Sequence, residues 1–433
     1  NKTEAVKWYK RAAEQDHAEA QYDLGECYYH GWGVQKNEGE AVKWFEEAAE
    51  NYNADAQYEL GCCYYNGEGV EKNSAKAVEW YRKSAENGNA SAQYNLGICY
   101  EYGQSVTQSK VTAAEWYRKA ADQGIASAQY KIGLFYENGY GVAQNKEEAA
   151  KWYRKAADQG DADAQCNLGY CYKTGDGVTK DPVRAVELYR KAADQGNASA
   201  QNNLGYCYKN GEGVEKNSAK AVEWYRKSAE NGNASAQYNL GICYEYGQSV
   251  TQSKVTAAEW YRKAADQGIA SAQYKIGLFY ENGYGVAQNK EEAAKWYRKA
   301  AEQGNADAQN SLGYCYYCGE GVKKDFGKAA EWYRKSAEQG NATAQRNLAI
   351  FYKNGYGVTQ NKEEAVKWYR KSAEQGYADA QYNLAELLLW KDGEEAFKWY
   401  QKAAKQGHAG AQDSLGLCYE ETDMEMEIYW GMG

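Results

Sequence analysis

The sequence has one proline and three histidines among its 433 residues, and it has no long apolar run. No segment approaches the roughly 20 consecutive apolar residues that a membrane-spanning helix needs, so none is expected. The histidines, His17, His30 and His408, do not form an H-E-x-x-H arrangement and have no cysteine pair at zinc-finger spacing beside them. We therefore expect no metal site, and the sequence indicates no cofactor and no catalytic residue.

Positive charge is also scarce. There are 51 lysines and arginines against 60 aspartates and glutamates, a net charge of −9. This balance repels phosphate backbones, so nucleic acid is not expected as a partner. The first residues, NKTEAVKWYK, resemble neither a signal peptide nor a chain start. The compartment is therefore not indicated, and the bacterial cytoplasm, periplasm and cell exterior all stay open.

Hydrophobic residues make up 43% of the chain and aromatic residues 15%, which excludes a disordered protein. The length exceeds that of one compact core, so the chain contains either several domains or a core that grows along one dimension. An internal repeat indicates a core that grows along one dimension. Tryptophan recurs every 36 residues, with Leu188 in the one slot that lacks it: Trp8, Trp44, Trp80, Trp116, Trp152, Trp224, Trp260, Trp296, Trp332 and Trp368.

A second duplication lies inside the first. Residues 66–157 and 210–301 are identical over 92 positions at an offset of 144, which is four periods. Folding constraints do not explain this identity, because solvent-facing positions repeat as faithfully as core positions. It indicates recent copying or deliberate construction.

Each repeat contains two amphipathic stretches. In residues 90–124, Ala92, Leu96 and Cys99 fall at i, i+4 and i+7 on one helical face, here named helix A. After a glycine-bearing loop, Ala113, Tyr117 and Ala120 mark a second stretch, here named helix B. No segment has the pattern of a strand. The sequence therefore predicts an all-α fold, an array of about twelve 36-residue helix–loop–helix repeats.

The helix boundaries carry their own signals. Asparagine or aspartate stands where an N-cap should accept backbone N–H bonds, as at Asn73 and Asp181, and Pro182 follows at the first helical position, where proline is tolerated. Glycines such as Gly88 and Gly124 close helix B, where a left-handed residue is wanted.

The recurring line A-x-A-Q-Y-x-L-G-x-x-Y-x-x-G-x-G-V, followed by A-x-x-W-Y-x-K-A-A-x-Q-G, resembles the Sel-1-like repeat family, a relative of the tetratricopeptide repeats. Examples are ADAQYELGCCYYNGEGV at 54–70 and AVEWYRKSAENG at 77–88. The resemblance covers residues 1–419, whereas 420–433 match no repeat position and form a divergent tail or a degenerate cap. It implies a right-handed α/α superhelical solenoid, and a scaffold that binds proteins or peptides through a concave helix A surface. Ala349 and Ala385 replace the glycine seen at Gly97, where packing is expected to loosen.

The positions of most cysteines do not indicate a catalytic, redox or metal-binding role. Seven of them share one helix A position with phenylalanines, as Cys99 does with Phe135, so this position is a core position and its thiols are expected to be free. Cys315 and Cys318 form a C-x-x-C, for which a redox or metal role is the alternative to incidental placement. Because every notable residue recurs with the repeat instead of gathering once, we expect no enzyme.

Function is then expected at helix A positions that vary between repeats. The first such column, our candidate protein-binding surface, comprises Tyr22, Tyr58, Tyr94, Tyr130, Cys166, Asn202, Tyr238, Tyr274, Asn310, Arg346 and Tyr382. The second comprises Tyr29, Tyr65, Glu101, Glu137, Lys173, Lys209, Glu245, Glu281, Tyr317 and Lys353. Tyrosine is favoured at interfaces, although packing between repeats would also explain the first column.

The ends support an alternative. The chain opens on a helix B and its last repeat stretch, 409–419, is a helix A, so one copy could receive the next in a head-to-tail filament or tube. The candidate contact residues are Trp8, Tyr9, Leu415, Tyr419, Ile428 and Trp430. A capping helix formed by 420–433 would block such a polymer.

Overall fold

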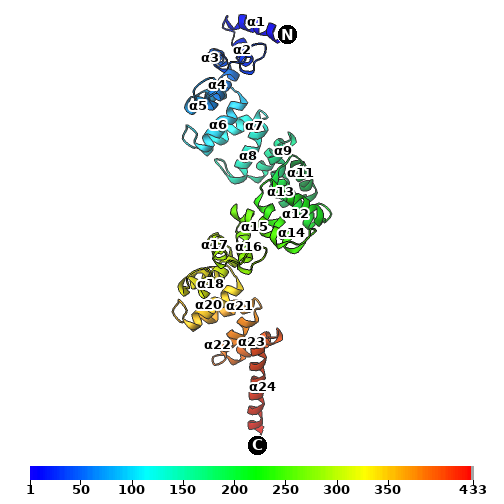
Figure 1. Ribbon diagram of the computed structural model, residues 1–433, viewed down its shortest axis with the longest axis vertical. Coiled ribbons are helices and arrows are strands. Elements are labelled where there is room, and N and C mark those ends of the chain that lie inside the picture. The colour runs from blue at the N-terminus through cyan, green and yellow to red at the C-terminus, as the bar shows by residue number, and fades with distance from the viewer. Residues whose placement is uncertain (431–433) are drawn as a thin grey trace. The chain divides into compact units, whose positions relative to one another are not determined.

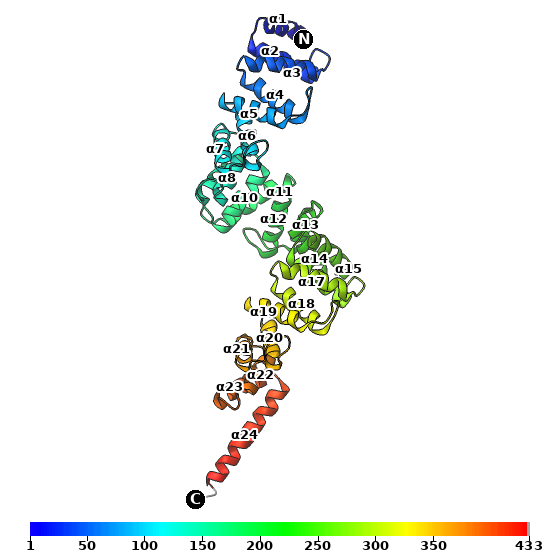
Figure 2. The same ribbon diagram turned by 90° about the vertical axis from the view of Figure 1, so that its left-hand side faces the viewer.

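The computed structural model describes the backbone of residues 1–430 and the side chains of residues 1–419. Within this part the chain forms 24 α-helices joined by loops, and no strand occurs there. The chain divides into two compact units, Asn1–Trp224 (unit 1) and Tyr225–Gly433 (unit 2). Consecutive helices pack against one another from α1 to α12 in unit 1 and from α14 to α24 in unit 2 (Figures 1 and 2). The predicted all-α repeat fold is confirmed.

Odd-numbered helices are the predicted helices B, and even-numbered helices are the predicted helices A. Unit 1 contains α1 (Lys2–Ala13), α2 (Ala18–His30), α3 (Glu38–Glu50), α4 (Ala54–Asn66), α5 (Ser74–Glu86), α6 (Ala90–Tyr102), α7 (Lys110–Asp122), α8 (Ala126–Asn138), α9 (Lys146–Asp158), α10 (Ala162–Thr174), α11 (Pro182–Asp194) and α12 (Ala198–Asn210). The division between the units falls within α13 (Ser218–Glu230). Unit 2 contains α14 (Ala234–Tyr246), α15 (Lys254–Asp266), α16 (Ala270–Asn282), α17 (Lys290–Glu302), α18 (Ala306–Cys318), α19 (Phe326–Glu338), α20 (Ala342–Asn354), α21 (Lys362–Glu374), α22 (Ala378–Leu388), α23 (Gly393–Lys405) and α24 (Ala409–Trp430).

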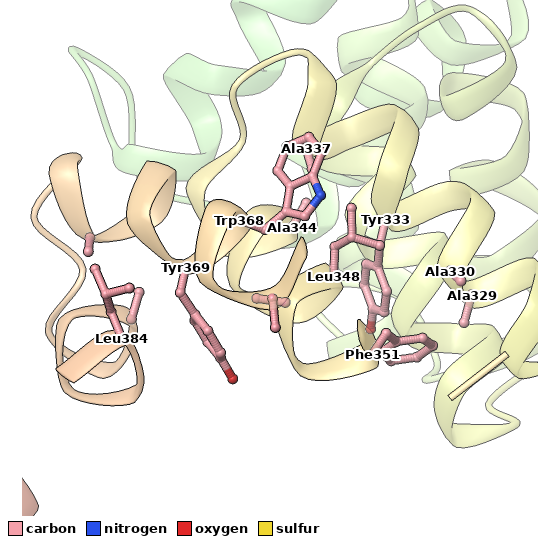
Figure 3. Packing of buried hydrophobic residues seen from close by; sticks show 14 of the residues in the cluster. Ala329, Ala330, Tyr333, Ala337, Ala344, Leu348, Phe351, Trp368, Tyr369 and Leu384 are labelled. Atoms are coloured by element: carbon pink, nitrogen blue, oxygen red, sulfur yellow. The ribbon is translucent and has the colours of Figure 1, made fainter. Parts of the chain in front are cut away.

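The core of each repeat lies between its helix A and its helix B. Leu96 of α6 and Tyr117 of α7 are fully buried. The aromatic ring of Tyr117 lies against Gly97, where an added Cβ would come within 2.6 Å of the tyrosine Cδ1. In unit 2, Tyr333 lies beside Phe351, with 5.2 Å between ring centroids (Figure 3). The helix A glycine therefore admits the large helix B ring.

The predicted caps are confirmed. The side chain of Asn73 accepts a 3.0 Å hydrogen bond from the backbone N–H of Lys76, and Pro182 occupies the start of α11. Gly88 closes the helix B turn with a φ of 94°, a left-handed conformation that L side chains rarely adopt. Helix A therefore starts at the same place in each repeat, which fixes its exposed face.

A ladder of glutamines joins successive repeats. Gln93, which is almost fully buried on α6, donates from Nε2 to the backbone oxygen of Ala85 at 3.1 Å. Its Oε1 accepts a 2.8 Å hydrogen bond from Gln123, at the end of helix B in the same repeat, whereas Ala85 belongs to the preceding repeat. Because buried amides are costly without partners, this ladder fixes each helix A between the helix B before it and the helix B after it.

The last helix differs from the simple repeat plan. Helix α24 runs without interruption from Ala409 to Trp430, so the described backbone of 420–430 continues the last helix A. A capping helix formed by 420–433, which was one expectation for the tail, stays a prediction. Assigning 420–433 as a region distinct from 1–419 stays a prediction.

Candidate protein-binding surface

The first variable column lies at the fifth residue of each helix A, and its members are half-buried except for Cys166, which is buried. Each tyrosine ring of the column packs on a helix B ring of its own repeat. The Tyr94 and Tyr117 ring centroids are 5.8 Å apart, and those of Tyr130 and Tyr153 are 5.9 Å apart. Burial raises the pKa of Tyr130 to about 12. Part of each ring is therefore packing surface, and part of it faces solvent.

The column also reaches the following repeat. The hydroxyl of Tyr94 is hydrogen-bonded to Ser127 of α8, and that of Tyr274 to Ser311 of α18. Packing between repeats, the alternative explanation of this column, therefore accounts for some of its contacts. The role of the column in binding stays a prediction.

The second column has a role that sequence reasoning missed. The hydroxyl of Tyr153, a buried helix B residue, donates to Oε2 of Glu137 at 2.6 Å, and Tyr297 donates likewise to Glu281 at 2.7 Å. The two residues of each pair are 16 positions apart. The glutamates of this column are therefore acceptors for buried tyrosines as well as surface residues.

Two of these glutamates are also held by a lysine of the next helix A. Lys131 Nζ lies 3.1 Å from Oε2 of Glu101 in unit 1, and Lys275 lies 3.1 Å from Glu245 in unit 2. The bridge crosses the space between successive helices A. At this repeat position, the ion pair therefore fills the space between successive helices A in both units.

At two positions where the column carries lysine, the helix B tyrosine has no carboxylate partner among the described residues. Lys173 stands 16 residues before Tyr189, and Lys353 stands 16 residues before Tyr369. The hydroxyls of Tyr189 and Tyr369 are buried and have no hydrogen-bond partner among the described residues. Unpartnered buried hydroxyls are destabilising, so lysine at this column should lower the stability of its repeat while it changes the helix A surface.

At two tyrosines of this column, Tyr65 and Tyr317, a pocket opens. In unit 1 a cavity of about 290 Å³ lies between α4 and α6, with Cys62, Tyr65, Tyr81, Asn95 and Ile98 in its lining. In unit 2 a cavity of about 220 Å³ lies between α18 and α20, and its lining residues are Tyr314, Tyr317, Tyr333, Arg346, Asn347, Ile350 and Phe351. Six of the lining positions correspond at an offset of 252 residues, or seven repeats. The same helix A position thus forms a pocket in each unit.

The two pockets have different electrostatic surroundings. Near the unit 1 pocket, burial and then the charges of Glu26, Asp55 and Glu68 raise the pKa of Glu59 to about 7. The unit 2 pocket instead has Arg346 in its wall. The unit 1 region is therefore acidic, whereas the unit 2 pocket presents a cation.

The repeat pattern matches a known family along almost the whole chain. The family model of the Sel1 repeat matches residues 1–17, 18–53, 54–89, 90–125, 126–161, 162–197, 198–233, 234–269, 270–305, 306–341, 342–377 and 378–408. The chain belongs to the Sel1 repeat family. This confirms the family resemblance that the motifs predict.

Two solved structures are similar to this Sel1 repeat chain. One is c5321, a protective antigen present in uropathogenic Escherichia coli strains and displaying an SLR fold, at 37% identity and a TM-score of 0.79. That match covers 96% of this chain and 90% of the other. The second is a Sel1 repeat protein from Oxalobacter formigenes, at 34% identity and a TM-score of 0.57, covering 72% of this chain and 90% of the other. Among curated proteins, no relative matches by sequence.

The histidines of the Sel1 repeat chain behave as cap residues. His17 Nδ1 accepts from the backbone N–H of Ala20 at 3.2 Å, and His408 Nδ1 accepts from that of Ala411 at 3.1 Å. Within the described residues no three His, Cys, Asp or Glu side chains are grouped to hold a metal ion. In the same part of the chain, no helix is both long and apolar enough to cross a bilayer.

The cysteines are free thiols, as the period predicts. Burial raises the pKa of Cys99 to about 11 and that of Cys315 to about 12, which disfavours their thiolate forms. Cys318, by contrast, is exposed. The buried thiols have the environment of core residues.

The candidate end-contact residues lie in different units. In unit 1, Trp8 is 60% exposed beneath the guanidinium of Arg11, and Tyr9 is half-buried. In unit 2, Leu415 is half-buried, and the exposed Tyr419 packs its ring edge against Phe397 at 5.5 Å. The side chains of Ile428 and Trp430 lie outside the described residues.

Proposed function

We propose that this Sel1 repeat chain is a non-catalytic scaffold that binds segments of other proteins through its helix A surface, the concave face that the family resemblance implies. The recurrence of a side-chain-sized pocket at one helix A position in both units carries this proposal. Tyr65 is 41% exposed and stands in the pocket wall, where an aromatic ring can contribute to binding. No cofactor is needed for this function.

A random peptide library displayed on phage tests the proposal without knowledge of the natural partner. Peptides selected on the parent chain should bind at least tenfold more weakly to a Tyr65→Ala variant when they occupy the unit 1 pocket. Tyr140→Ala is the matched control, because Tyr140 is also 41% exposed but does not line the pocket. The proposal is wrong if no selected peptide is sensitive to Tyr65→Ala or to Tyr317→Ala in the unit 2 pocket.

Self-assembly is the second candidate. Trp8 of α1 and Tyr419 of α24 each expose more than half of their surface, which leaves apolar area for contact with another copy. Light scattering across a concentration series tests it. A mass that stays at 48.6 kDa contradicts self-assembly, whereas uniform filaments in electron micrographs would support it.

A further inference from the structure

The pocket between α18 and α20 combines aromatic walls with a cation that is only partly neutralised. We infer that it binds a large apolar side chain of an extended peptide while Arg346 binds a neighbouring carboxylate of the same peptide. This inference rests on the proposed function and names the chemistry of the partner: a segment with an acidic residue beside an aromatic one.

The walls set the size and character of the apolar group. The rings of Tyr317 and Phe351 lie 5.5 Å apart between centroids, and Tyr333 meets Phe351 edge-on at 5.2 Å. The volume of about 220 Å³ lies below the roughly 300–1,000 Å³ of small-molecule sites. The pocket therefore suits one side chain better than a free metabolite.

Arg346 has unused hydrogen-bonding capacity. A guanidinium has five N–H donors, yet its Nη2 contacts Asp379 at 3.0 Å, its Nη1 makes a long 3.4 Å contact with Asn347, and its Nε has no partner among the described residues. The side chain is 32% exposed. A ligand carboxylate can therefore reach this guanidinium.

Asp379 is a weak competitor for the guanidinium. Its carboxylate is 53% exposed, and ion pairs at such sites contribute little to stability. It also lies 3.5 Å from His408 Nε2, so it keeps a neighbour when Arg346 turns toward a ligand. Exchange of one carboxylate for another should cost little.

Charges at the opposite wall orient the ligand. The pKa of Tyr314 is raised to about 12, first by a hydrogen bond with Cys318 and further by the charges of Glu320 and Glu281. These two carboxylates repel an anion from the Tyr314 side. The Arg346 side is then the favoured end for the ligand carboxylate.

The unit 1 pocket serves as an internal comparison. Its lining carries no arginine or lysine, and Glu59 lies on the same helix as Cys62 and Tyr65 of its wall. A peptide carboxylate should be repelled there. Carboxylate-dependent binding is therefore assigned to unit 2 alone.

Two capped hexapeptides test the inference, identical except that one carries aspartate and the other asparagine beside a single phenylalanine. Fluorescence anisotropy with the full chain should give about tenfold tighter binding of the aspartate peptide. Arg346→Gln should abolish this preference, Arg346→Lys should keep part of it, and Asp379→Asn should strengthen it by removing the competitor. Arg298→Gln is the matched control, because Arg298 is bonded to Tyr316 and does not line the pocket.

Circular dichroism confirms that each variant is folded before titration. Equal affinity for the two peptides, a preference that survives Arg346→Gln, or no binding of the aspartate peptide at millimolar concentration would each overturn the inference. The phage selection is read independently at Tyr65 and Tyr317. The hexapeptides can fail to bind as expected while the selected peptides still bind more weakly to the Tyr65→Ala or Tyr317→Ala variant. That result excludes the carboxylate site and retains the scaffold function.

Discussion

The hydroxyl of Tyr153 donates a 2.6 Å hydrogen bond to Oε2 of Glu137, and this bond joins the core of a repeat to its helix A surface. Tyr153 is fully buried, and Glu137 is the carboxylate that accepts from its hydroxyl, with the side chain of Asn167 as a second neighbour. The variable column and the core are thereby coupled. Any change on the surface at Glu137 also changes the stability of α9.

Removing the acceptor should destabilise the repeat. Glu137→Ala removes the carboxylate acceptor of the buried Tyr153 hydroxyl, which should cost about 1–3 kcal/mol. Adding Tyr153→Phe to that variant should recover most of the loss, because no polar group is then stranded. Native-state hydrogen exchange of the α9 amides measures the local free energy of opening. Equal protection in the parent and Glu137→Ala would show that the bond does not matter.

The repeat with lysine at this column should respond in the opposite way. Tyr189 is fully buried and its hydroxyl has no partner, so Tyr189→Phe should leave the opening free energy of α11 unchanged or raise it by up to about 1 kcal/mol. The same exchange experiment on α11 measures this. A loss of stability comparable to that of Tyr153→Phe would show that Tyr189 has a partner after all.

Stability should depend on pH through Glu59. Its pKa is raised, chiefly by burial, from the usual 4.5 to about 7, so the folded chain binds this proton more tightly than the unfolded chain. Stability should therefore fall as pH rises from about 4.5 to about 7. Glu59→Gln should be more stable than the parent at pH 8, by about 1 kcal/mol after allowance for solvent screening. Urea titrations at pH 5 and pH 8 check this, and an equal difference at both pH values would contradict it.

A methyl group at Gly97 should be poorly tolerated. The added Cβ would come within 2.6 Å of the Tyr117 ring, and overpacking of this kind costs about 1–3 kcal/mol. Thermal unfolding of Gly97→Ala measures the loss. Ala349 occupies the equivalent position with its methyl fully buried, so Ala349→Gly is the informative comparison. It should lose about 1 kcal/mol from helix propensity and not gain stability, since its repeat already packs around alanine.

Thiol reactivity should separate the cysteines by burial. Cys318 is exposed, whereas burial raises the pKa of Cys99 to about 11 and leaves little thiolate at neutral pH. Brief labelling with a charged thiol reagent should modify Cys318 first, as mass spectrometry of peptides would show. Cys318→Ser should remove that fast phase. Rapid modification of Cys99 in the native chain would contradict the packing described above.

The period of the sequence predicted most of the fold for identifiable reasons. Asn73 and Gly88 mark helix ends because capping chemistry is local, and Cys99 shares a position with Phe135 because core positions accept only apolar groups. Trp152 and Tyr153 are neighbours in the sequence and are both buried, yet only the structure shows the glutamate that Tyr153 requires. Such a contact joins two helices, and the spacing of residues in the sequence does not specify how one helix is rotated relative to the other.

The pockets could not be predicted because they arise where the side chains of a repeat fill less space than those at the equivalent positions of other repeats. In the unit 1 pocket Cys62 is smaller than the Tyr206 found four repeats later. In both pockets an asparagine, Asn95 or Asn347, stands at the repeat position where Lys131 forms an ion pair. A single sequence shows these substitutions as variation without telling which of them opens a space. The uninterrupted course of α24 beyond residue 419 was missed for a related reason, since residues 420–430 depart from the repeat and leave its period without information.

Site-specific photo-cross-linking of a selected peptide tests the central claim most directly. A benzophenone amino acid is placed at position 65 on helix A in one variant and at the exposed position 119 on helix B in another. The scaffold proposal predicts peptide adducts from position 65 and none from position 119 for peptides that occupy the unit 1 pocket. Adducts from position 119 alone would place binding on the helix B surface and contradict the account.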